Sequence, residues 1–465
     1  MTGSEPVVID LGAAEPWAPP DTLRPRRRAS AGTRLAALLL VATLAAGLPV
    51  ADAAVSGPLL HIGAGVSDAT LGDGRLFVTR SLGAGGHRLD AYDAAGGAVL
   101  WSTELDDGQQ LAFADAGVVV LSEYSANDPA LATVTVRDAR TGAELWRRGG
   151  ARVVGMVGGR ILTSDLSKAE PEQGAERVPP ESRVLAVDAR TGAVAWTLVV
   201  PAGSNSSYGR DPRNPYGVSS LAVMDPDGTL RVYDPADGAV ERTYRIERSS
   251  SSAHFVLGDD DGLSAPGARA GQVAVGFRDL HPAHRDRQAS EDVYDLATGR
   301  LLWHLDVSEP SAVLTGCAPG RWCTTDSHGL AAYDPATGEQ VWRVEAYDLI
   351  FGDAGGDLVL GRLGEEGRPL PDLLVVDGRT GTPRHRLDGW RAIRAPGGRG
   401  VVWRRDEGQR ATVVGLLDPA SGRIAVFGRG DSWAGEPRCV TGGGFVACGV
   451  VGDLTVWRLP VTAGG

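Results

Sequence analysis

The chain has 465 residues, enough for one large domain or two to three ordinary ones, and 43% of them are hydrophobic. Charged residues make up 22%, and the 64 Gly have no three-residue period, so disordered and collagen-like chains are both excluded. The net charge of -12 argues against nucleic acid as a partner, because phosphate contacts require clustered Lys and Arg. Abundant turn residues and the even spread of 11 Trp indicate a repetitive all-β chain.

The first segment, residues 1–33, is polar and rich in Pro and Arg, which predicts a disordered cytoplasmic tail. Residues 34–55 are predicted to form a transmembrane helix, because the run from Leu35 to Ala51 contains no charged residue. The Arg residues before this run place its N-terminal side in the cytoplasm and the rest of the chain outside. The alternative is a signal peptide cleaved near Ala51, which would release the same exported part as a secreted protein.

A repeat begins after this segment, so residues 56–461 are predicted to form one β-propeller, followed by a short tail at 462–465. Eight segments share an Asp followed by a Gly four positions later, at spacings of 39 to 61 residues. These turn pairs are Asp93 and Gly97, Asp138 and Gly142, Asp188 and Gly192, Asp234 and Gly238, Asp295 and Gly299, Asp334 and Gly338, Asp377 and Gly381, and Asp418 and Gly422. In five segments a Trp follows the Asp by eight positions, at Trp101, Trp146, Trp196, Trp303 and Trp342.

The turn chemistry of a β-hairpin explains why Asp and Gly recur in each repeat. The Asp ends a strand and starts a turn by bonding its own backbone, and the Gly takes the positive φ of a tight hairpin. Two more strands precede this hairpin, so each unit is predicted to be a four-stranded antiparallel blade. The Trp is predicted to pack between neighbouring blades, since its ring is large and its N–H can reach a carbonyl. A substrate-contacting Trp or a catalytic Asp is the alternative, and it would require the same role in many blades.

The two ends of the repeat region predict how the ring closes. The segment Cys439–Leu459 looks like three strands of a further unit, and the stretch after Pro58 is placed to supply the fourth. N- and C-terminal strands would then share one blade. Eight turns plus this shared blade count as nine, which exceeds the usual four to eight blades. We therefore predict eight blades, with the unit around Asp234 degenerate, and keep seven and nine open.

The repeated Asp-x-x-x-Gly-x-x-x-Trp pattern resembles the PQQ-like (quinoprotein dehydrogenase-like) β-propeller repeat family over residues 58–460. The Val7-Val-Ile-Asp-Leu-Gly stretch and the basic lead into one membrane helix also resemble membrane-anchored actinobacterial members. Dehydrogenases of this family stack the quinone on a Trp, bind calcium and carry a disulfide between adjacent Cys. This sequence has no adjacent Cys pair and no matching calcium ligands, so the resemblance implies the fold without the PQQ cofactor.

The family also includes non-catalytic scaffolds, such as the propeller lipoprotein of outer-membrane protein assembly, although this chain lacks a lipobox Cys after its apolar run. Three functions therefore compete. The first is a membrane-anchored extracytoplasmic module that binds a protein or a cell-envelope polymer without catalysis. The second is an accessory factor for envelope protein assembly or secretion, and the third is a quinone-dependent dehydrogenase. We expect the first, in a monomeric propeller without catalytic, cofactor or metal residues.

Four Cys lie in the exported part and allow three pairings. The local pairing, Cys317 with Cys323 and Cys439 with Cys448, fits best because each pair brackets the hairpin of the first two strands of a unit. Zinc is the rival, but zinc sites usually use a C-x2-C spacing. The pair His281 and His284 and the acidic run 259–261 lack the further ligands or the spacing of a metal site.

Loop lengths predict where binding takes place. Connections between strands two and three and between blades open on one face of a propeller, and the Asp turns open on the other. The long polar segments are assigned to the first face: 122–131, 164–183, 201–216, 278–292 and 361–372. Within them Tyr208, Arg210, Arg213 and Tyr216 form an aromatic and cationic mixture that is common in binding patches. We expect a protein or glycan contact there, against the alternative of tolerated, solvated insertions.

Overall fold

The computed structural model describes residues 57–459 except 84, 124–131, 166–179, 212–213, 247–253, 258–270, 279–288, 308–313, 318–319, 355, 365–367, 394–399, 407, 409–410, 432–436 and 451. The chain divides into two compact units, Met1–Asp52 and Ala53–Gly465. The predicted tail 1–33, membrane helix 34–55 and C-terminal tail 462–465 lie outside the described residues. Among the described residues, no helix is long and apolar enough to cross a membrane.

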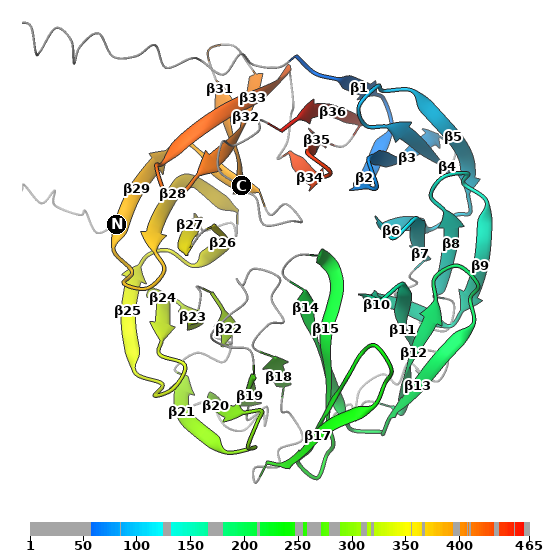
Figure 1. Cartoon of the computed structure of the whole chain (residues 1–465). Coiled ribbons are helices and arrows are strands. Elements are labelled where there is room, and N and C mark those ends of the chain that lie inside the picture. The colour runs from blue at the N-terminus through cyan, green and yellow to red at the C-terminus, as the bar shows by residue number, and fades with distance from the viewer. Residues whose placement is uncertain are drawn as a thin grey trace, which may run out of the picture. The chain divides into compact units, whose positions relative to one another are not determined.

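The described part of the second unit is all-β, as predicted, and its strands follow one another as antiparallel hairpins (Figure 1). The first four groups of strands in chain order are β2 (Val66–Gly72), β3 (Arg75–Gly83), β4 (Gly86–Asp93) and β5 (Val99–Leu105); β6 (Gln109–Asp115), β7 (Val118–Glu123), β8 (Thr133–Asp138) and β9 (Glu144–Gly149); β10 (Ala151–Val157), β11 (Arg160–Asp165), β12 (Ser182–Asp188) and β13 (Val194–Val200); and β14 (Asn205–Asp211), β15 (Asn214–Met224), β16 (Thr229–Tyr233) and β17 (Val240–Arg245).

The second half of the unit repeats this arrangement. Its strands are β18 (His254–Leu257), β19 (Gln272–Arg278), β20 (Ala289–Asp295) and β21 (Leu301–Val307); β22 (Thr315–Gly316), β23 (Trp322–Asp326), β24 (Gly329–Tyr333) and β25 (Gln340–Glu345); β26 (Leu349–Ala354), β27 (Asp357–Leu363), β28 (Pro369–Asp377) and β29 (Pro383–Asp388); β30 (Arg391–Ile393), β31 (Val401–Asp406), β32 (Ala411–Asp418) and β33 (Arg423–Asp431); and β34 (Arg438–Gly442), β35 (Phe445–Val450) and β36 (Asp453–Arg458).

The number of blades differs with the way in which they are counted. The described strands form seven four-stranded sheets and one eight-stranded sheet. The larger sheet contains two units, β10–β13 and β14–β17, which are joined by a parallel pairing of Met156 with Gly217. Counting sheets gives eight and counting four-stranded units gives nine, so the prediction of eight blades is not confirmed. The unit around Asp234 was expected to be degenerate, but it has all four of its strands.

The first described strand completes the last sheet. Strand β1 (Leu60–Gly63) pairs antiparallel with β36, with Leu60 opposite Val456 and Gly63 opposite Asp453. The Gly452 N–H also donates to the Val66 carbonyl oxygen at 2.8 Å, which joins this sheet to the first strand of the next one. N- and C-terminal segments therefore share one sheet, as the sequence predicted.

The core lies between neighbouring sheets. Middle strands are buried on both faces, whereas the outermost strand β5 alternates between exposed and half-buried side chains. Phe77 and Leu89 of the first sheet pack against Leu111 and Val119 of the second. Burying such a side chain contributes about 1.5–3 kcal/mol. Because one sheet cannot cover both of its own faces, each depends on two neighbours for its stability.

Candidate functional site

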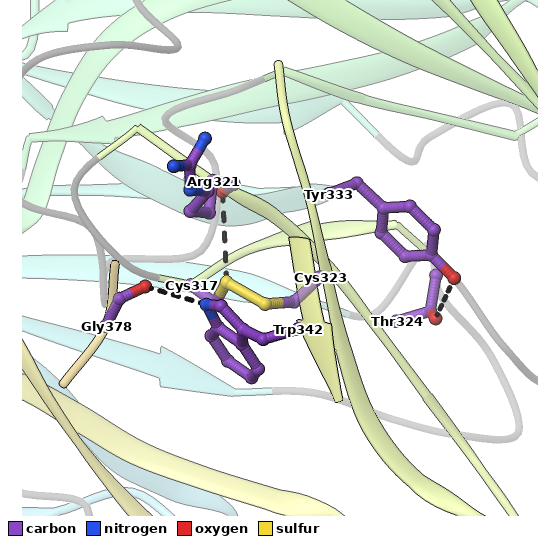
Figure 2. The surroundings of a disulfide bond; sticks show 7 residues. All are labelled: Cys317, Arg321, Cys323, Thr324, Tyr333, Trp342 and Gly378. Atoms are coloured by element: carbon purple, nitrogen blue, oxygen red, sulfur yellow. Dashed lines mark hydrogen bonds between the residues drawn. A yellow bond between two sulfur atoms is a disulfide. The ribbon is translucent and has the colours of Figure 1, made fainter. Parts of the chain in front are cut away.

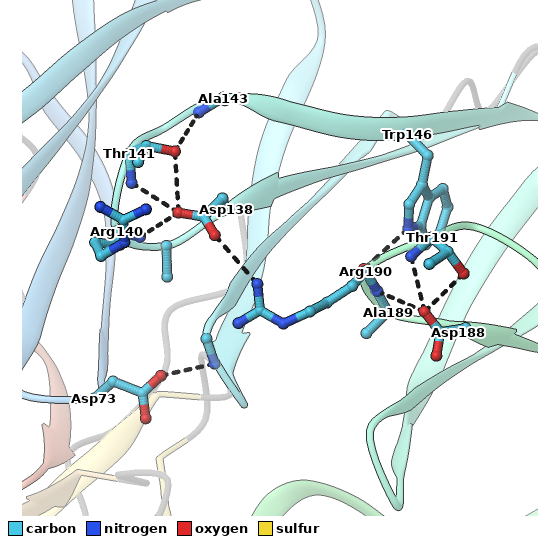
Figure 3. Close-up of polar contacts among 12 residues, drawn as sticks. Asp73, Asp138, Arg140, Thr141, Ala143, Trp146, Asp188, Ala189, Arg190 and Thr191 are labelled. Atoms are coloured by element: carbon cyan, nitrogen blue, oxygen red, sulfur yellow. Dashed lines mark hydrogen bonds and ion pairs between the residues drawn. The ribbon is translucent and has the colours of Figure 1, made fainter.

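Each predicted Asp turn joins the third strand of a unit to the fourth, and Asp138 shows the geometry (Figure 3). Its Oδ1 accepts hydrogen bonds from the backbone N–H groups of Arg140 and Thr141, at 3.0 and 2.9 Å. The Gly142 N–H donates to the Asp138 carbonyl oxygen at 2.8 Å. The same bond closes all eight turns, and the eight Gly have φ values between 66° and 75°. Gly is needed there because other residues adopt a positive φ only at a cost.

The turn carboxylates are held by their own turns and by nearby Arg side chains. At Asp377, Oδ2 accepts a hydrogen bond from Arg384 at 2.5 Å, and Oδ1 accepts bonds from the backbone N–H groups of Arg379 and Thr380. These donors, Arg384 first, lower the pKa of Asp377 to about 2. A carboxylate stabilised in its charged form is a poor proton acceptor, so this geometry fits a structural role for the residue.

The five repeat Trp lie between neighbouring units. The Nε1–H of Trp146 donates to the carbonyl oxygen of Ala189, which directly follows Asp188 of the next turn, at 3.0 Å (Figure 3). The next Gly, Gly192, lies so close to this ring that a Cβ there would be 2.8 Å from Cγ of Trp146. The other four Trp make the same contact, with Nε1 donating to Ala139 from Trp101, to Ala236 from Trp196, to Pro335 from Trp303 and to Gly378 from Trp342.

Two of the three units that lack the Trp keep the same hydrogen bond, whereas the third has Val426 at this position. Arg242 takes the equivalent position in its unit and donates to the Leu296 carbonyl oxygen at 2.8 Å. His385 does so in its unit, with Nε2 3.2 Å from the Ala420 carbonyl oxygen. The sequence pattern does not reveal these two residues, because Arg, His and Trp share a hydrogen-bond donor here and not their identity. We call this set of contacts the inter-unit latch.

The segment 201–216 differs from the expected long loop. It contains β14 and the start of β15, so Tyr208 and Tyr216 lie in paired strands. Tyr208 is half-buried among side chains that include Leu221. Arg213 and the side chain of Arg210 lie outside the described residues. Of the four predicted residues, Tyr208 and Tyr216 have described side chains, and both are half-buried in paired strands.

The β14–β15 hairpin instead contacts the innermost strands of other sheets, and Figure 1 shows it reaching inward. Tyr216 stacks on Phe113 of β6 with ring centroids 4.9 Å apart, and its hydroxyl is 3.2 Å from Thr70 Oγ1 of β2. Asn214 donates to Asp115 Oδ2 at 2.7 Å. Burial raises the pKa of Tyr216. Because Phe113 and Asp115 are near the end of β6, the hairpin tip lies at the end that carries the Asp turns, opposite to the predicted face.

Both predicted disulfides are present, which confirms the local pairing. Cys317 bonds to Cys323 and Cys439 bonds to Cys448, and each bond joins the first two strands of a sheet. Figure 2 shows the first bond beside Trp342, whose Nε1–H donates to the Gly378 carbonyl oxygen at 3.1 Å. The disulfide therefore lies beside one contact of the inter-unit latch. With all four sulfurs paired, no free thiol remains.

The end of the sheets opposite to the Asp turns, which we call the loop end, has a small depression between the first and last sheets. Its volume is about 50 Å³, and Val66, Val440 and Leu454 contribute apolar walls. Asp68 and Arg438 add opposite charges. Desolvation raises the pKa of Asp68, although part of the residue stays exposed to solvent. The hydrogen bond from the Ala69 N–H and the charge of Arg438 lower this pKa. The depression was missed from the sequence because its residues come from the two ends of the propeller.

No group of three His, Cys, Asp or Glu that could hold a metal ion occurs in the described part of the chain. The candidate residues His281 and His284 and the acidic run 259–261 lie outside it. The described groups at the depression are suited to hydrogen bonding and charge pairing, with Asp453 Oδ1 3.4 Å from His61 Nδ1.

Comparison with known families identifies the repeat. Residues 41–161, 131–265 and 289–431 match the family described as outer membrane protein assembly factor BamB. The chain belongs to this BamB-like family. The match confirms the resemblance to PQQ-like repeats, while the membrane-anchored actinobacterial type stays a prediction. Comparison with curated proteins found no match.

Solved structures similar to this BamB-like chain include a eukaryotic initiation factor, which is 14% identical with a TM-score of 0.51 over 80% of this chain and 91% of that one. BamB from Moraxella catarrhalis is 15% identical with a TM-score of 0.36, covering 87% and 97% of the two chains. A europium-containing methanol dehydrogenase is 14% identical with a TM-score of 0.39, covering 88% and 95%. At these identities the first likeness shows the fold alone.

Proposed function

We propose that this BamB-like propeller is a non-catalytic binding module that presents its loop end to a protein partner outside the cytoplasm. The observation that carries the proposal is the depression between the first and last sheets. Its apolar walls include Val66 and Leu454, and Asp68 and Arg438 lie beside them. An apolar centre with a polar rim is the usual anatomy of a protein interface. The family's description as an assembly factor supports a protein as the partner.

The inter-unit latch supports the same proposal. Each latch bond holds the turn of one unit against the fourth strand of the unit before it, as between Trp146 and Ala189. Neighbouring sheets are therefore held in one relative position before a partner arrives. A preorganised surface loses less conformational freedom on binding, so more of the contact energy appears as affinity.

A role as an accessory factor in envelope protein assembly is the more specific form of this proposal, and the family description favours it. The quinone-dependent dehydrogenase is the contrasting function. Titration of the protein with PQQ and calcium, followed by a dye-linked oxidation assay, separates them. Saturable quinone binding with turnover would overturn the non-catalytic proposal, whereas we expect neither.

Anchoring by a helix at residues 34–55 is part of the proposal, and it rests on the uncharged run in the sequence. We expect the full chain to stay with membranes after alkaline carbonate extraction, and a chain beginning at residue 57 to be released. If expression of the full chain yields a product that begins near residue 52 and is free of membranes, the cleaved signal peptide is favoured instead.

Site-directed photocrosslinking tests the binding face. A photoreactive benzoylphenylalanine at Ser67 would lie beside the depression, and one at Ala95 would lie in an exposed Asp turn at the other end. In the full chain in its native membranes, we expect one discrete protein adduct from Ser67 and none from Ala95. Adducts of equal yield from both positions, or from neither, would contradict the proposal.

A further inference from the structure

The charge of the chain is strongly uneven. Residues 379–438 contain 12 Arg and six acidic residues, a net charge of +6 in a chain with a net charge of -12. The remainder of the chain therefore carries -18. Part of this basic region forms β30 and β31, and the question is whether its cations are neutralised within the fold or presented to solvent.

Two Arg–Trp pairs are formed by residues of β30 and β31 and by Trp390, the residue directly before β30. The Arg391 guanidinium carbon is 5.0 Å from the ring centroid of Trp403, its partner residue on the neighbouring strand. The Arg404 guanidinium carbon is 4.9 Å from the ring centroid of Trp390. Both Trp are buried, with exposed fractions of 8% and 5% for Trp390 and Trp403. Stacking on a buried ring favours one orientation of the guanidinium, because the ring is held in place by its surroundings.

The two Arg differ in what else they contact. Arg391 donates from Nε to the Pro369 carbonyl oxygen at 3.1 Å. Arg404 is exposed, and within the part of the chain that the structure describes its guanidinium forms no hydrogen bond and no ion pair. Its five N–H donors are therefore oriented by Trp390 and open to an external acceptor.

The strand register places Arg404 at the loop end. Arg404 pairs with Val413, at the start of β32, whereas the Asp turn of this unit follows Asp418 at the other end of that strand. Arg438, which lines the depression, is the first residue of β34, the innermost strand of the next sheet. Arg404 and the depression thus belong to the same end of two neighbouring sheets.

We propose that Arg404, oriented by Trp390, docks a short acidic segment of the partner protein at the loop end. This inference rests on the proposed function and adds the chemistry of the partner. A carboxylate accepts two parallel hydrogen bonds from a guanidinium fork, which matches the free donors of Arg404. Arg391 on the paired strand and Arg438 at the depression add positive charge at the same end of these two sheets, and this charge attracts an anionic segment.

The charge distribution also selects the class of anion. A short peptide with a few carboxylates can be bound by these few Arg side chains. A long polyanion, such as a nucleic acid or an anionic envelope polymer, would extend beyond them over a protein whose net charge is -12. Repulsion there opposes its binding, so an acidic peptide segment is the occupant that fits.

The test measures binding of a fluorescent 12-residue Asp/Glu-rich peptide to the full chain in detergent, by anisotropy at low and at physiological salt. We expect Arg404→Gln to weaken binding about 10-fold, because one charge-assisted bidentate contact is lost. Arg404→Lys keeps the charge and loses the planar fork, so it should recover only part of the affinity. Arg423→Gln is the matched control: Arg423 is exposed and lies in the same basic region, but it pairs with Asp418 at the Asp-turn end.

Equal effects of Arg404→Gln and Arg423→Gln would overturn the proposal, since binding would then follow net charge alone. Absence of peptide binding, or tighter binding of a long polyglutamate or of heparin than of the peptide, would overturn it as well. If the peptide fails to bind while the Ser67 crosslink persists, the acidic docking site is wrong and the binding function stands. If the crosslink is absent while the peptide binds with the expected variant pattern, the docking site at Arg404 stands and the depression is wrong as the protein contact.

Discussion

The indole Nε1 of Trp342 is 3.1 Å from the carbonyl oxygen of Gly378, and Gly381 of the same turn packs against the indole ring. One side chain therefore binds the backbone of the next unit and also excludes any Cβ at the turn Gly. Backbone bonds between units are few, such as the pairing of Met156 with Gly217, so side-chain contacts of this kind and the apolar packing between sheets hold neighbouring units together. They are the natural place to perturb the fold.

Replacing Gly381 with Ala should destabilise the protein through two effects. The residue has a φ of 67°, which costs a non-Gly residue about 1 kcal/mol, and the added Cβ would lie 2.7 Å from the Trp342 ring. Overpacking adds about 1–3 kcal/mol, so the total expected loss is about 2–4 kcal/mol. Urea unfolding followed by Trp fluorescence measures it.

Gly74 supplies the control for this prediction. Its φ of 71° is almost the same, but a Cβ there would meet nothing within 4 Å. Gly74→Ala should cost only the conformational part, about 1 kcal/mol. Equal losses for the two variants would show that the ring contact does not restrict the turn.

The two disulfides should each contribute moderately to stability. Cys439 and Cys448 are nine residues apart, and Cys317 and Cys323 are six apart, so each bond closes a short loop. Loop closure of this size stabilises by about 2–3 kcal/mol in the chain-entropy model. We expect the double variant Cys439→Ala with Cys448→Ala to lose this amount, measured by urea unfolding under oxidising conditions. In reducing buffer the difference between this variant and the native protein should shrink; an unchanged difference would mean that the sulfur packing, and not the bond, stabilises the fold.

His304 should make stability depend on pH near neutrality. Its Nδ1 is 2.5 Å from Oδ1 of the buried Asp292, and its Nε2 is 3.0 Å from Oδ1 of Asp306. The hydrogen bond to Asp292 chiefly, followed by the contact with Asp306, raises the pKa of His304 above its usual 6.5. The protonated form is favoured in the folded state, so this contribution is complete below about pH 6.5 and is lost as the pH rises through the higher folded-state pKa.

Urea midpoints measured from pH 5.5 to 8.5 test this dependence. The native protein should lose stability across the upper part of this range. In His304→Gln the side chain no longer titrates, so that part of the slope should disappear. An identical slope in the variant would assign the dependence to another group.

Strand β1 should be required for full stability although it has only four residues. It completes the sheet of β34, β35 and β36, and Ile62 in it is buried with an exposed fraction of 5%. A chain beginning at residue 64 should therefore be less stable than one beginning at residue 57, by at least about 2 kcal/mol. Ile62→Ser in the longer chain should reproduce much of this loss. The exposed neighbour His61 is the control, and His61→Ser should change stability far less.

Much of the fold followed from local patterns in the sequence. The spacing from Asp93 to Gly97 and its seven repetitions predict a hairpin, because turn chemistry depends on residues that are adjacent in the chain. The period of the turns predicts four-stranded units, and short spacings predict the pairings Cys317–Cys323 and Cys439–Cys448. The likeness of the two chain ends to parts of one unit predicted the pairing of β1 with β36. Each of these inferences uses a signal contained within one repeat.

Other features were decided only by the tertiary structure. Residues 201–216 read as a polar loop, yet Tyr216 packs on Phe113 because the β14–β15 hairpin meets strands of other sheets. The depression brings Asp68 together with Arg438, and the stack brings Trp390 to Arg404, through the packing of sheets and the register of strands. Period and turn chemistry carry no information about such distant pairs. The repeat itself therefore determined the architecture of this protein, and only contacts beyond one repeat pattern produced the depression and the Arg404–Trp390 stack at the loop end.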